Sequence, residues 1–493
     1  MAAFRLVVLQ GLLLAACVAQ PPSSSDPGTD PSAGGTDDTI TDVCSGGRVH
    51  CYAKRLHRAE LSGRSLANTP PAITPADLAK AYNFDPTQKV TATIGIVDAY
   101  GYPTLEADLA KFRSTYSLPP CTSASGCLKI LAQDGSTNLP GPPPGTDDWT
   151  LETALDVDMA SAACPSCNIL VVQATSDQDN GLDIANSTAA AAGATVISNS
   201  WGGPYDQTAD PQNETYFTHT GVAIFVAAGD DGYDDGENVA DYPSTSPHVI
   251  AVGGTTLTKD NSTRGFTETT WSSGGSSCQK DTVNFPLPSF QTGVVPATAC
   301  KGRAASDVAA LGDPNTGVMI YDNSGLSDGQ GDTDNGLIGP IGGTSLASPL
   351  TASIFALEGH GNATAALPYA NATAFNDVTT GTNGTCGTAM CEAGKGWDGP
   401  TGMGTPNGAL LAAIAGGTGV GSGSDSGSDS GSGSDDGSGD TTTDGDGGTN
   451  GNADNGSSII SGGCATSNGA GGAMLIVMLG LAIARRRRAT CVG

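Results

Sequence analysis

Positively charged residues are scarce in this chain of 493 residues. It contains 21 lysine and arginine residues against 50 aspartate and glutamate residues, which gives a formal net charge of −29. Nucleic acids and anionic lipids are bound mainly through clustered basic side chains, so this balance argues against both as partners. An acidic surface instead suits an extracellular protein, or one that works at low pH, where carboxylates are partly neutralised.

Charged and aromatic residues are few as well. They make up 14% and 5% of the chain, whereas glycine alone accounts for 70 residues. The length allows one large or two ordinary domains. The composition indicates a loop-rich protein that builds a large core over only part of that length.

The first 20 residues have the pattern of an export signal peptide. Arg5 is followed by an apolar run over residues 6–16 and then by small residues. The same stretch resembles a bacterial lipobox in which Cys17 is lipidated, and ordinary cleavage near Ala19 is the alternative. Residues 21–65 are expected to form a disordered spacer and a short leader, because proline, serine, glycine and aspartate dominate their start.

The carboxyl-terminal part is also unlike a folded domain. Residues 416–463 consist of Gly/Ser/Asp/Thr repeats without lysine or arginine, which predicts a flexible linker. In residues 464–493, Cys464 precedes an apolar run over residues 473–484 and four arginines. This layout resembles the myxosortase-processed sorting tails of bacterial surface proteins, and a plain membrane anchor is the alternative. Both place the protein outside the cytoplasm.

Between these ends, residues 66–415 have the composition of a folded domain. Apolar, β-branched runs alternate with helix-like segments, which predicts a parallel sheet covered by helices on both faces. The expected strands are residues 91–98, 168–173, 195–200, 222–227 and 248–252, and the expected helices are residues 105–116 and 184–192. Active sites in such sheets lie at the carboxyl ends of the strands.

A candidate nucleophile lies in residues 342–349, Gly-Gly-Thr-Ser-Leu-Ala-Ser-Pro. The small, apolar run after Ser345 predicts a helix that begins near this serine. Unpaired backbone N–H groups at a helix start can hold an oxyanion, so Ser345 suits nucleophilic catalysis. A plain N-cap serine is the commoner alternative, and the decision depends on a base elsewhere in the chain.

The base is expected to be a carboxylate. None of the five histidines opens a helix at the end of a predicted strand: His50, His57, His219, His248 and His360. Residues 149–160 form a helical pattern in which Glu152 and Asp156 are spaced i, i+4, on one face. Mostly small or apolar neighbours indicate that the pair is partly buried, so one carboxyl group is pushed to keep its proton. A solvated acidic face is the alternative.

A third carboxylate follows the predicted strand at residues 222–227. Asp230 lies in the sequence Ala-Gly-Asp-Asp-Gly, at what should be a strand's carboxyl end. Read alone, these residues are an ordinary turn, for which glycine and aspartate are favoured.

Together, these motifs resemble the sedolisins, serine-carboxyl peptidases with a subtilisin-like fold. The resemblance rests on Thr-Ser-Leu-Ala-Ser-Pro at 344–349, the pair Glu152 and Asp156, Ser-Asn-Ser-Trp-Gly at 198–202 and Gly-Asp-Asp-Gly at 229–232. It implies an α/β, subtilisin-like three-layer fold with a central, mostly parallel sheet and helices on both faces.

The resemblance also implies a role for each candidate residue. Ser345 is the nucleophile, Glu152 the general base, Asp156 the residue that orients and tunes Glu152, and Asp230 the acid of the oxyanion hole. A carboxyl group donates a hydrogen bond only while protonated, so activity is expected at acidic pH. Sedolisins usually have a large amino-terminal pro-segment, whereas only a short stretch precedes the domain here.

The same resemblance implies one calcium ion near the end of the domain. Its ligands would be Asp377, the carbonyl groups of Val378, Gly394 and Gly396, and Asp398. Carboxylate and carbonyl oxygens are the ligands that Ca²⁺ prefers. Without the family, Gly-x-Gly-x-Asp at 394–398 is an ordinary turn.

Cysteine spacing supports export. Ten of the thirteen cysteines fall inside or next to the domain as close neighbours along the chain. Pairing of neighbours would give five local disulfides in an oxidising compartment: Cys44–Cys51, Cys121–Cys127, Cys164–Cys167, Cys278–Cys300 and Cys386–Cys391. The Cys-Pro-Ser-Cys sequence at 164–167 could instead be redox-active or half of a zinc site, but no second such motif exists.

The sequence therefore predicts a secreted, cell-surface endopeptidase that acts on polypeptides as a monomer. A catalytically inactive adhesion or scaffold protein on the same fold is one alternative. A subtilisin-type peptidase with a histidine base is the other.

Overall fold

The computed structural model describes residues 38–414, apart from residues 45–46, 58–71, 146, 179, 237 and 327–332. The predicted signal peptide, linker and sorting segment lie outside these residues, as do Cys17 and Cys464, and remain predictions. Within the described ranges, no helix combines the length and apolar character needed to cross a bilayer.

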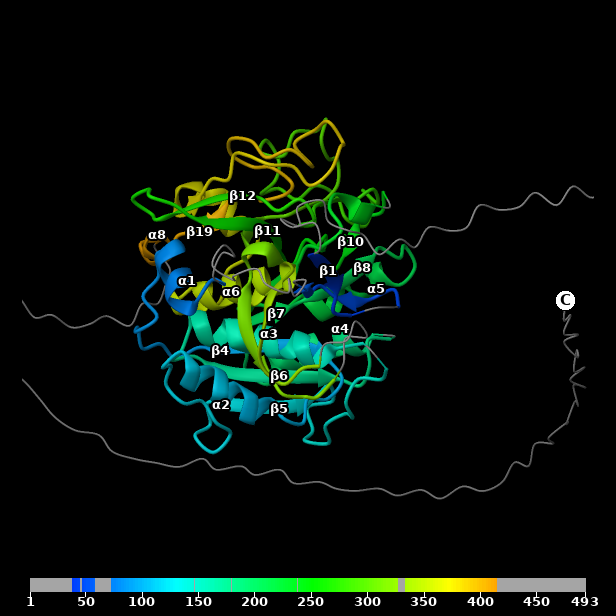
Figure 1. The fold of residues 1–493 in the computed structure, drawn as a ribbon. Helices are drawn as coiled ribbons and strands as arrows, with labels where there is room; N and C mark the ends of the chain where they lie inside the picture. Colours follow the sequence, from blue (N-terminus) through cyan, green and yellow to red (C-terminus); the bar gives the residue numbers. More distant parts are fainter. Residues whose placement is uncertain are drawn as a thin grey trace, which may run out of the picture. The chain divides into compact units, whose positions relative to one another are not determined.

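A central sheet of eight strands organises the fold (Figure 1). Its strand order is β12-β11-β9-β7-β4-β6-β5, with β15 also paired to β11. Every pair in it is parallel except β11 with β12. The strands are β4 (Thr93–Ala99), β5 (Leu128–Ala132), β6 (Asn168–Ala174), β7 (Val196–Asn199), β9 (Ala223–Ala227), β11 (Ile250–Lys259), β12 (Phe266–Thr270) and β15 (Val308–Leu311).

Helices lie on both faces of this sheet, as the side chains of β4 show. Successive residues of a strand point to opposite faces. A Cβ atom at Gly95 would meet Ala189 of α4 (Gly181–Ala191) at 3.3 Å, whereas Asp98 faces Thr153 of α3 (Trp149–Ala163). The predicted α/β, subtilisin-like fold with a mostly parallel central sheet is confirmed.

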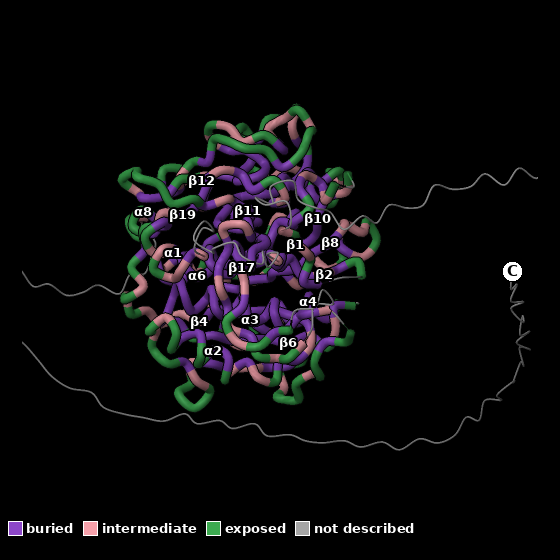
Figure 2. Tube along the Cα trace, in the orientation of Figure 1, coloured by how far each residue is buried: buried purple, intermediate pink, exposed green. Residues whose placement is uncertain are grey.

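Two buried helices, α3 and α6 (Thr344–Leu357), pack against each other in the interior. Every residue of both helices is buried, whereas exposed residues lie on outer loops and on outer elements such as α2 (Leu105–Thr115) (Figure 2). Their small and apolar residues allow this close packing. The other helices are α1 (Pro75–Ala81), α5 (Asp210–Asn213), α7 (Ala366–Ala370) and α8 (Gly408–Ala412).

The amino-terminal segment, residues 38–57, differs from the expectation of a spacer and short leader over residues 21–65. It forms β1 (Thr39–Asp42), β2 (His50–Cys51) and β3 (Lys54–His57). β2 pairs with β8 (Trp201–Pro204), and β3 pairs with β17 (Gly336–Gly342). Composition does not reveal that this segment forms strands, because the strands pair with others that are remote in the sequence.

Short strands complete the fold outside the central sheet. β17 also pairs with β16 (Val318–Asp322), and β8 also pairs with β10 (Asp241–Tyr242). The remaining strands are β13 (Ser277–Cys278), β14 (Ala304–Ala305), β18 (Phe375–Asn376) and β19 (Thr405–Pro406).

All five predicted disulfides are formed. They join Cys44–Cys51, Cys121–Cys127, Cys164–Cys167, Cys278–Cys300 and Cys386–Cys391. Each closes a short loop, from 3 to 22 residues in sequence separation. Cys164–Cys167 is therefore a clip at the end of α3.

Candidate functional site

Ser345 lies in the first turn of α6 and is fully buried. Its hydroxyl donates to the carbonyl oxygen of Ser200 at 3.2 Å and accepts the N–H of Tyr52 at 3.1 Å. Pro349 has no N–H to give to the Ser345 carbonyl oxygen in the helix. That oxygen instead accepts the hydroxyl of Ser200 at 3.4 Å.

Gly343 makes room beside Ser345 for two oxygen atoms. Its φ of 102° lies in the region that favours glycine. A Cβ atom here would lie 1.8 Å from the carbonyl oxygen of Tyr52 and 2.8 Å from Oδ2 of Asp230. These two oxygens therefore occupy the same small space next to the serine.

Glu152 and Asp156 lie one turn apart on α3, as predicted, and both are fully buried. Oε2 of Glu152 accepts the N–H of Ala53 at 3.0 Å. Oδ1 of Asp156 accepts the hydroxyl of Ser200 at 2.9 Å. α3 begins close to this point because Oδ1 of Asp148 accepts the N–H of Leu151 at 3.1 Å and caps the helix.

Burial raises the pKa of Glu152 well above its usual range, and the negative charge of Asp98 raises it further. The Ser345 hydroxyl and the Ala53 N–H act in the opposite direction because they stabilise the ionised form. The pKa of Asp156 is raised by the same burial, by Asp98 and by Glu152. The pair can therefore keep a proton at a pH where an exposed carboxyl group would lose it.

Asp98 is a third buried carboxyl group in this cluster and carried no predicted role. It ends the apolar run of β4, and neither of its oxygens has a hydrogen-bond partner among the described residues. Burial raises its pKa to about 7. The sequence offers one signal for its place in this cluster: an aspartate near the end of a buried strand.

Asp230 follows β9 and reaches the start of α6. Its Oδ1 accepts both the N–H and the hydroxyl of Thr344, each at 2.7 Å. Its Oδ2 is buried and lacks a hydrogen-bond partner in the described part of the chain. Burial raises the pKa of Asp230 to about 8, so the carboxyl group is neutral in acid and can donate through its free oxygen.

The Tyr52–Ala53 peptide bond lies between these groups. The N–H of Tyr52 is shared between the Ser345 hydroxyl and the Ser200 carbonyl oxygen, each at 3.1 Å. The N–H of Ala53 points at Glu152, and the Tyr52 carbonyl oxygen lies on the Gly343 side, near Asp230. No feature of the sequence predicts this placement.

The amino-terminal segment is held there on both sides of Ser345 by strand pairing. Before the Tyr52–Ala53 bond, β2 runs antiparallel to β8, with Cys51 opposite Trp201. After it, β3 runs antiparallel to β17, with Lys54 opposite Gly342. An extended chain added to exposed strand edges in this way is a common mode of peptide recognition.

The side chain of Tyr52 is buried. Its hydroxyl donates to Oδ2 of Asp241, which also lies next to Gly202. A Cβ atom at Gly202 would come within 2.7 Å of the Tyr52 hydroxyl, so glycine leaves room for this side chain.

The histidines do not supply a base. His57 contacts Thr41, and His219 contacts Ser187 and the Tyr216 carbonyl oxygen. His248 contacts Glu214, and His360 contacts the Leu411 carbonyl oxygen. The ring of His50 packs edge-on against Tyr52. Ser345 has no histidine among its hydrogen-bond partners in the described residues.

Two contacts join residues of the predicted calcium site. Asp377 accepts the N–H of Gly396 at 3.1 Å, and Oδ2 of Asp398 accepts the N–H of Gly394 at 2.9 Å. No donor among the described residues reaches the carbonyl oxygens of Val378, Gly394 or Gly396. Two carboxylates and three free carbonyl oxygens suit Ca²⁺, so these residues fit the ion.

The chain is similar in sequence to known peptidases. A model of the subtilase family matches residues 145–387. Kumamolisin from Bacillus sp. (strain MN-32) is 34% identical over 400 residues, which cover 74% of this chain and 67% of kumamolisin. Sedolisin from Pseudomonas sp. (strain 101) is 29% identical over 406 residues, which cover 73% of this chain and 64% of sedolisin.

A solved structure agrees with these sequence matches. Pseudomonas sedolisin, complexed with two molecules of pseudo-iodotyrostatin, superposes with a TM-score of 0.55 at 26% identity. The match covers 69% of this chain and 97% of that one. This chain spans about two thirds of the length of the curated relatives, 67% of kumamolisin and 64% of sedolisin.

Proposed function

Because the chain belongs to the sedolisin family of serine-carboxyl peptidases, we propose that it hydrolyses peptide bonds of polypeptides through an acyl-enzyme on Ser345, fastest at acidic pH. The observation that carries this proposal is the placement of the Tyr52–Ala53 peptide bond. The Ala53 N–H of this bond contacts Glu152, and its Tyr52 carbonyl oxygen lies near Asp230. The N–H of Tyr52, which belongs to the preceding peptide bond, contacts Ser345.

In this mechanism the Ser345 hydroxyl attacks the substrate carbonyl carbon while Glu152 takes the hydroxyl proton. When the C–N bond breaks, the same carboxyl group returns that proton to the leaving nitrogen. The contact between Glu152 and the Ala53 N–H supports this second step, because it places the carboxylate on the nitrogen that would leave. Asp156 orients Glu152 and shares its proton.

Asp230 stabilises the oxyanion of the tetrahedral intermediate. Its free Oδ2 faces the space that also holds the Tyr52 carbonyl oxygen. The group donates only while protonated, which its raised pKa of about 8 favours in acid. This requirement sets an upper limit to the working pH, near the pKa of Asp230.

The amino-terminal segment would block the site until it is cut. It pairs with strands on both sides of the serine and buries the Tyr52 side chain against Asp241. A substrate would bind in the same extended way. This segment would thus act as an internal block of the site.

A calcium ion held by Asp377, Asp398 and the carbonyl groups of Val378, Gly394 and Gly396 would stabilise the last part of the domain. The ion would supply only charge compensation and cross-linking of two loops there. Ten cysteines paired in five disulfides support folding in an oxidising compartment. Export, with the carboxyl-terminal tail holding the protein at the cell surface, remains a proposal of the same kind.

The test is digestion of an unfolded protein at acidic pH by the wild type, Ser345→Ala and Glu152→Gln. Both variants are expected to lose at least about 10³-fold in kcat/KM, because each lacks a group that acts in the transition state. Ser289→Ala and Glu392→Gln change exposed residues of the same types and should keep full activity. Activity that survives in both site variants would refute the mechanism.

A further inference from the structure

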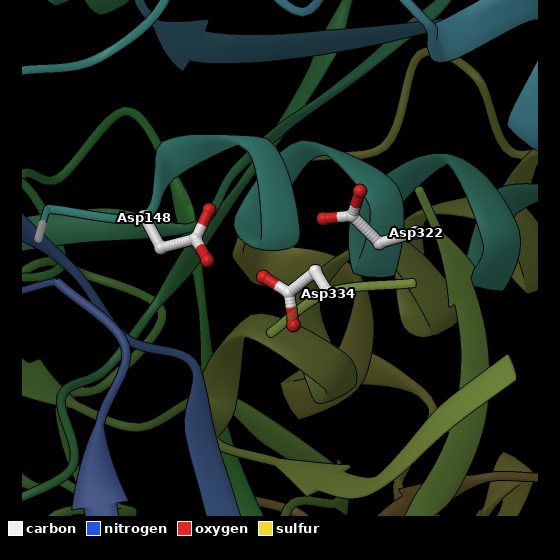
Figure 3. A group of neighbouring side chains, drawn as sticks. All are labelled: Asp148, Asp322 and Asp334. Carbon is white, nitrogen blue, oxygen red and sulfur yellow. The ribbon is translucent and has the colours of Figure 1, made fainter. Parts of the chain in front are cut away.

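Three buried aspartates outside the proposed catalytic site surround one small space (Figure 3). They are Asp148, the N-cap of α3; Asp322, the last residue of β16; and Asp334, which shortly precedes β17. One carboxylate oxygen of each lies within 4.8 Å of the other two. In Figure 3 their carboxyl groups point toward one another from three separate segments.

Each carboxylate uses only one of its oxygens for protein donors. Oδ1 of Asp148 caps α3, Oδ1 of Asp322 accepts the Tyr102 hydroxyl at 2.9 Å, and Oδ1 of Asp334 accepts Arg55 at 2.8 Å. Oδ2 of all three is buried and without a hydrogen-bond partner in the described residues. A buried carboxylate oxygen without a donor is costly, and the cluster contains three of them.

The separation of the oxygens fits a calcium ion. Calcium binds oxygen at about 2.4 Å, so two ligand oxygens on opposite sides of the ion lie about 4.8 Å apart. The charges also match: three carboxylates and the guanidinium group of Arg55 leave two negative charges, which one divalent cation neutralises. Asp148, Asp322 and Asp334 are 3%, 0% and 0% exposed, so bulk water does not hydrate their charges.

We propose that Asp148, Asp322 and Asp334 bind a divalent hard cation, calcium, in a structural site separate from the loop at Asp377. Such an ion would fasten the start of α3 to the hairpin of β16 and β17. α3 bears Glu152 one turn after Asp148, and β17 leads directly into Ser345. The site would therefore set the distance between two elements of the proposed catalytic site.

The experiment measures calcium binding by the full chain in a Ser345→Ala background, which prevents self-digestion and does not depend on peptidase activity. After chelation and dialysis, CaCl₂ is titrated in by calorimetry. The parent is expected to bind two calcium ions. Asp377→Asn, in the exposed loop, and Asp322→Asn should each bind one fewer, and the exposed control Asp134→Asn should bind as many as the parent.

The variant Asp377→Asn keeps the test decisive even where loss of the buried Asp322 impairs folding. Calcium that still binds to Asp377→Asn, and still raises its melting temperature, supports the proposed site. A folded Asp377→Asn variant that binds no calcium would overturn it. Unchanged binding by a folded Asp322→Asn variant would overturn it too. If only the loop site at Asp377 were absent, the parent and Asp377→Asn would bind the same number of calcium ions.

Discussion

The backbone N–H of Ala53 donates a hydrogen bond to Oε2 of Glu152 at 3.0 Å. The carboxylate that faces the Ser345 hydroxyl thus also contacts the nitrogen of a peptide bond from the same chain. In the proposed mechanism this one group takes a proton from the Ser345 hydroxyl and gives it to the leaving nitrogen. This relationship leads to the first prediction.

At acidic pH the wild-type chain should cut itself between Tyr52 and Ala53. The expected product begins at Ala53, and Ser345→Ala should stay intact, because it lacks the nucleophile. Intact mass and amino-terminal sequencing measure this. Ala53→Pro should slow the cut at least about tenfold, because proline has no N–H to contact Glu152. Cleavage only at other bonds would contradict the prediction.

Asp230 should control the alkaline side of the activity profile. Its raised pKa of about 8 means that the donor proton is present below this value and lost as pH rises through it. Asp230→Ala should lower kcat by about 10²- to 10³-fold. Asp230→Asn should lose less, because its amide donates at every pH, and kcat against pH measures both. Full activity of Asp230→Ala would show that another donor holds the oxyanion.

Asp98 should make the protein less stable as pH rises. Its pKa is raised by burial from 3.8 to about 7, so the folded state binds its proton more tightly. This contribution is complete below pH 3.8 and is lost as pH rises through about 7. Urea unfolding across this range should show that Asp98→Asn removes a slope of up to about 1.4 kcal/mol per pH unit.

The exposed variant Asp134→Asn serves as the control for Asp98→Asn and should keep the wild-type slope. Removing the Asp98 charge should also lower the pKa of Glu152 and Asp156, since this charge raises both. Identical slopes in all three proteins would mean that the pKa of Asp98 is the same in the folded and unfolded states.

The disulfide Cys278–Cys300 should stabilise the fold more than Cys386–Cys391. Their sequence separations are 22 and 5 residues, and a longer loop restricts the unfolded chain more. Loop-closure entropy predicts about 3.4 kcal/mol for the first and about 2.2 kcal/mol for the second. Paired Cys→Ala variants, compared by the free energy of unfolding in urea, measure the difference. Equal losses would show that local packing, rather than chain entropy, decides.

The sequence by itself determined the parts that depend on local pattern. Apolar, β-branched runs specified β4, β6, β7, β9 and β11, because a parallel strand is buried on both faces. The spacing of Glu152 and Asp156 put them on one face of α3, and neighbouring cysteines along the chain were close enough to pair. The predicted calcium site at Asp377 and Asp398 and the predicted catalytic role of Ser345 rest on resemblance to a family.

Only the tertiary structure decided what lies next to what. The antiparallel pairing of β2 with β8 and of β3 with β17 brings Tyr52 and Ala53 to Ser345, across nearly the whole described chain. The three aspartates of the proposed second metal site come from separate segments. Contacts of this kind depend on how the strands pair and how the helices pack, and no local pattern of residues encodes them.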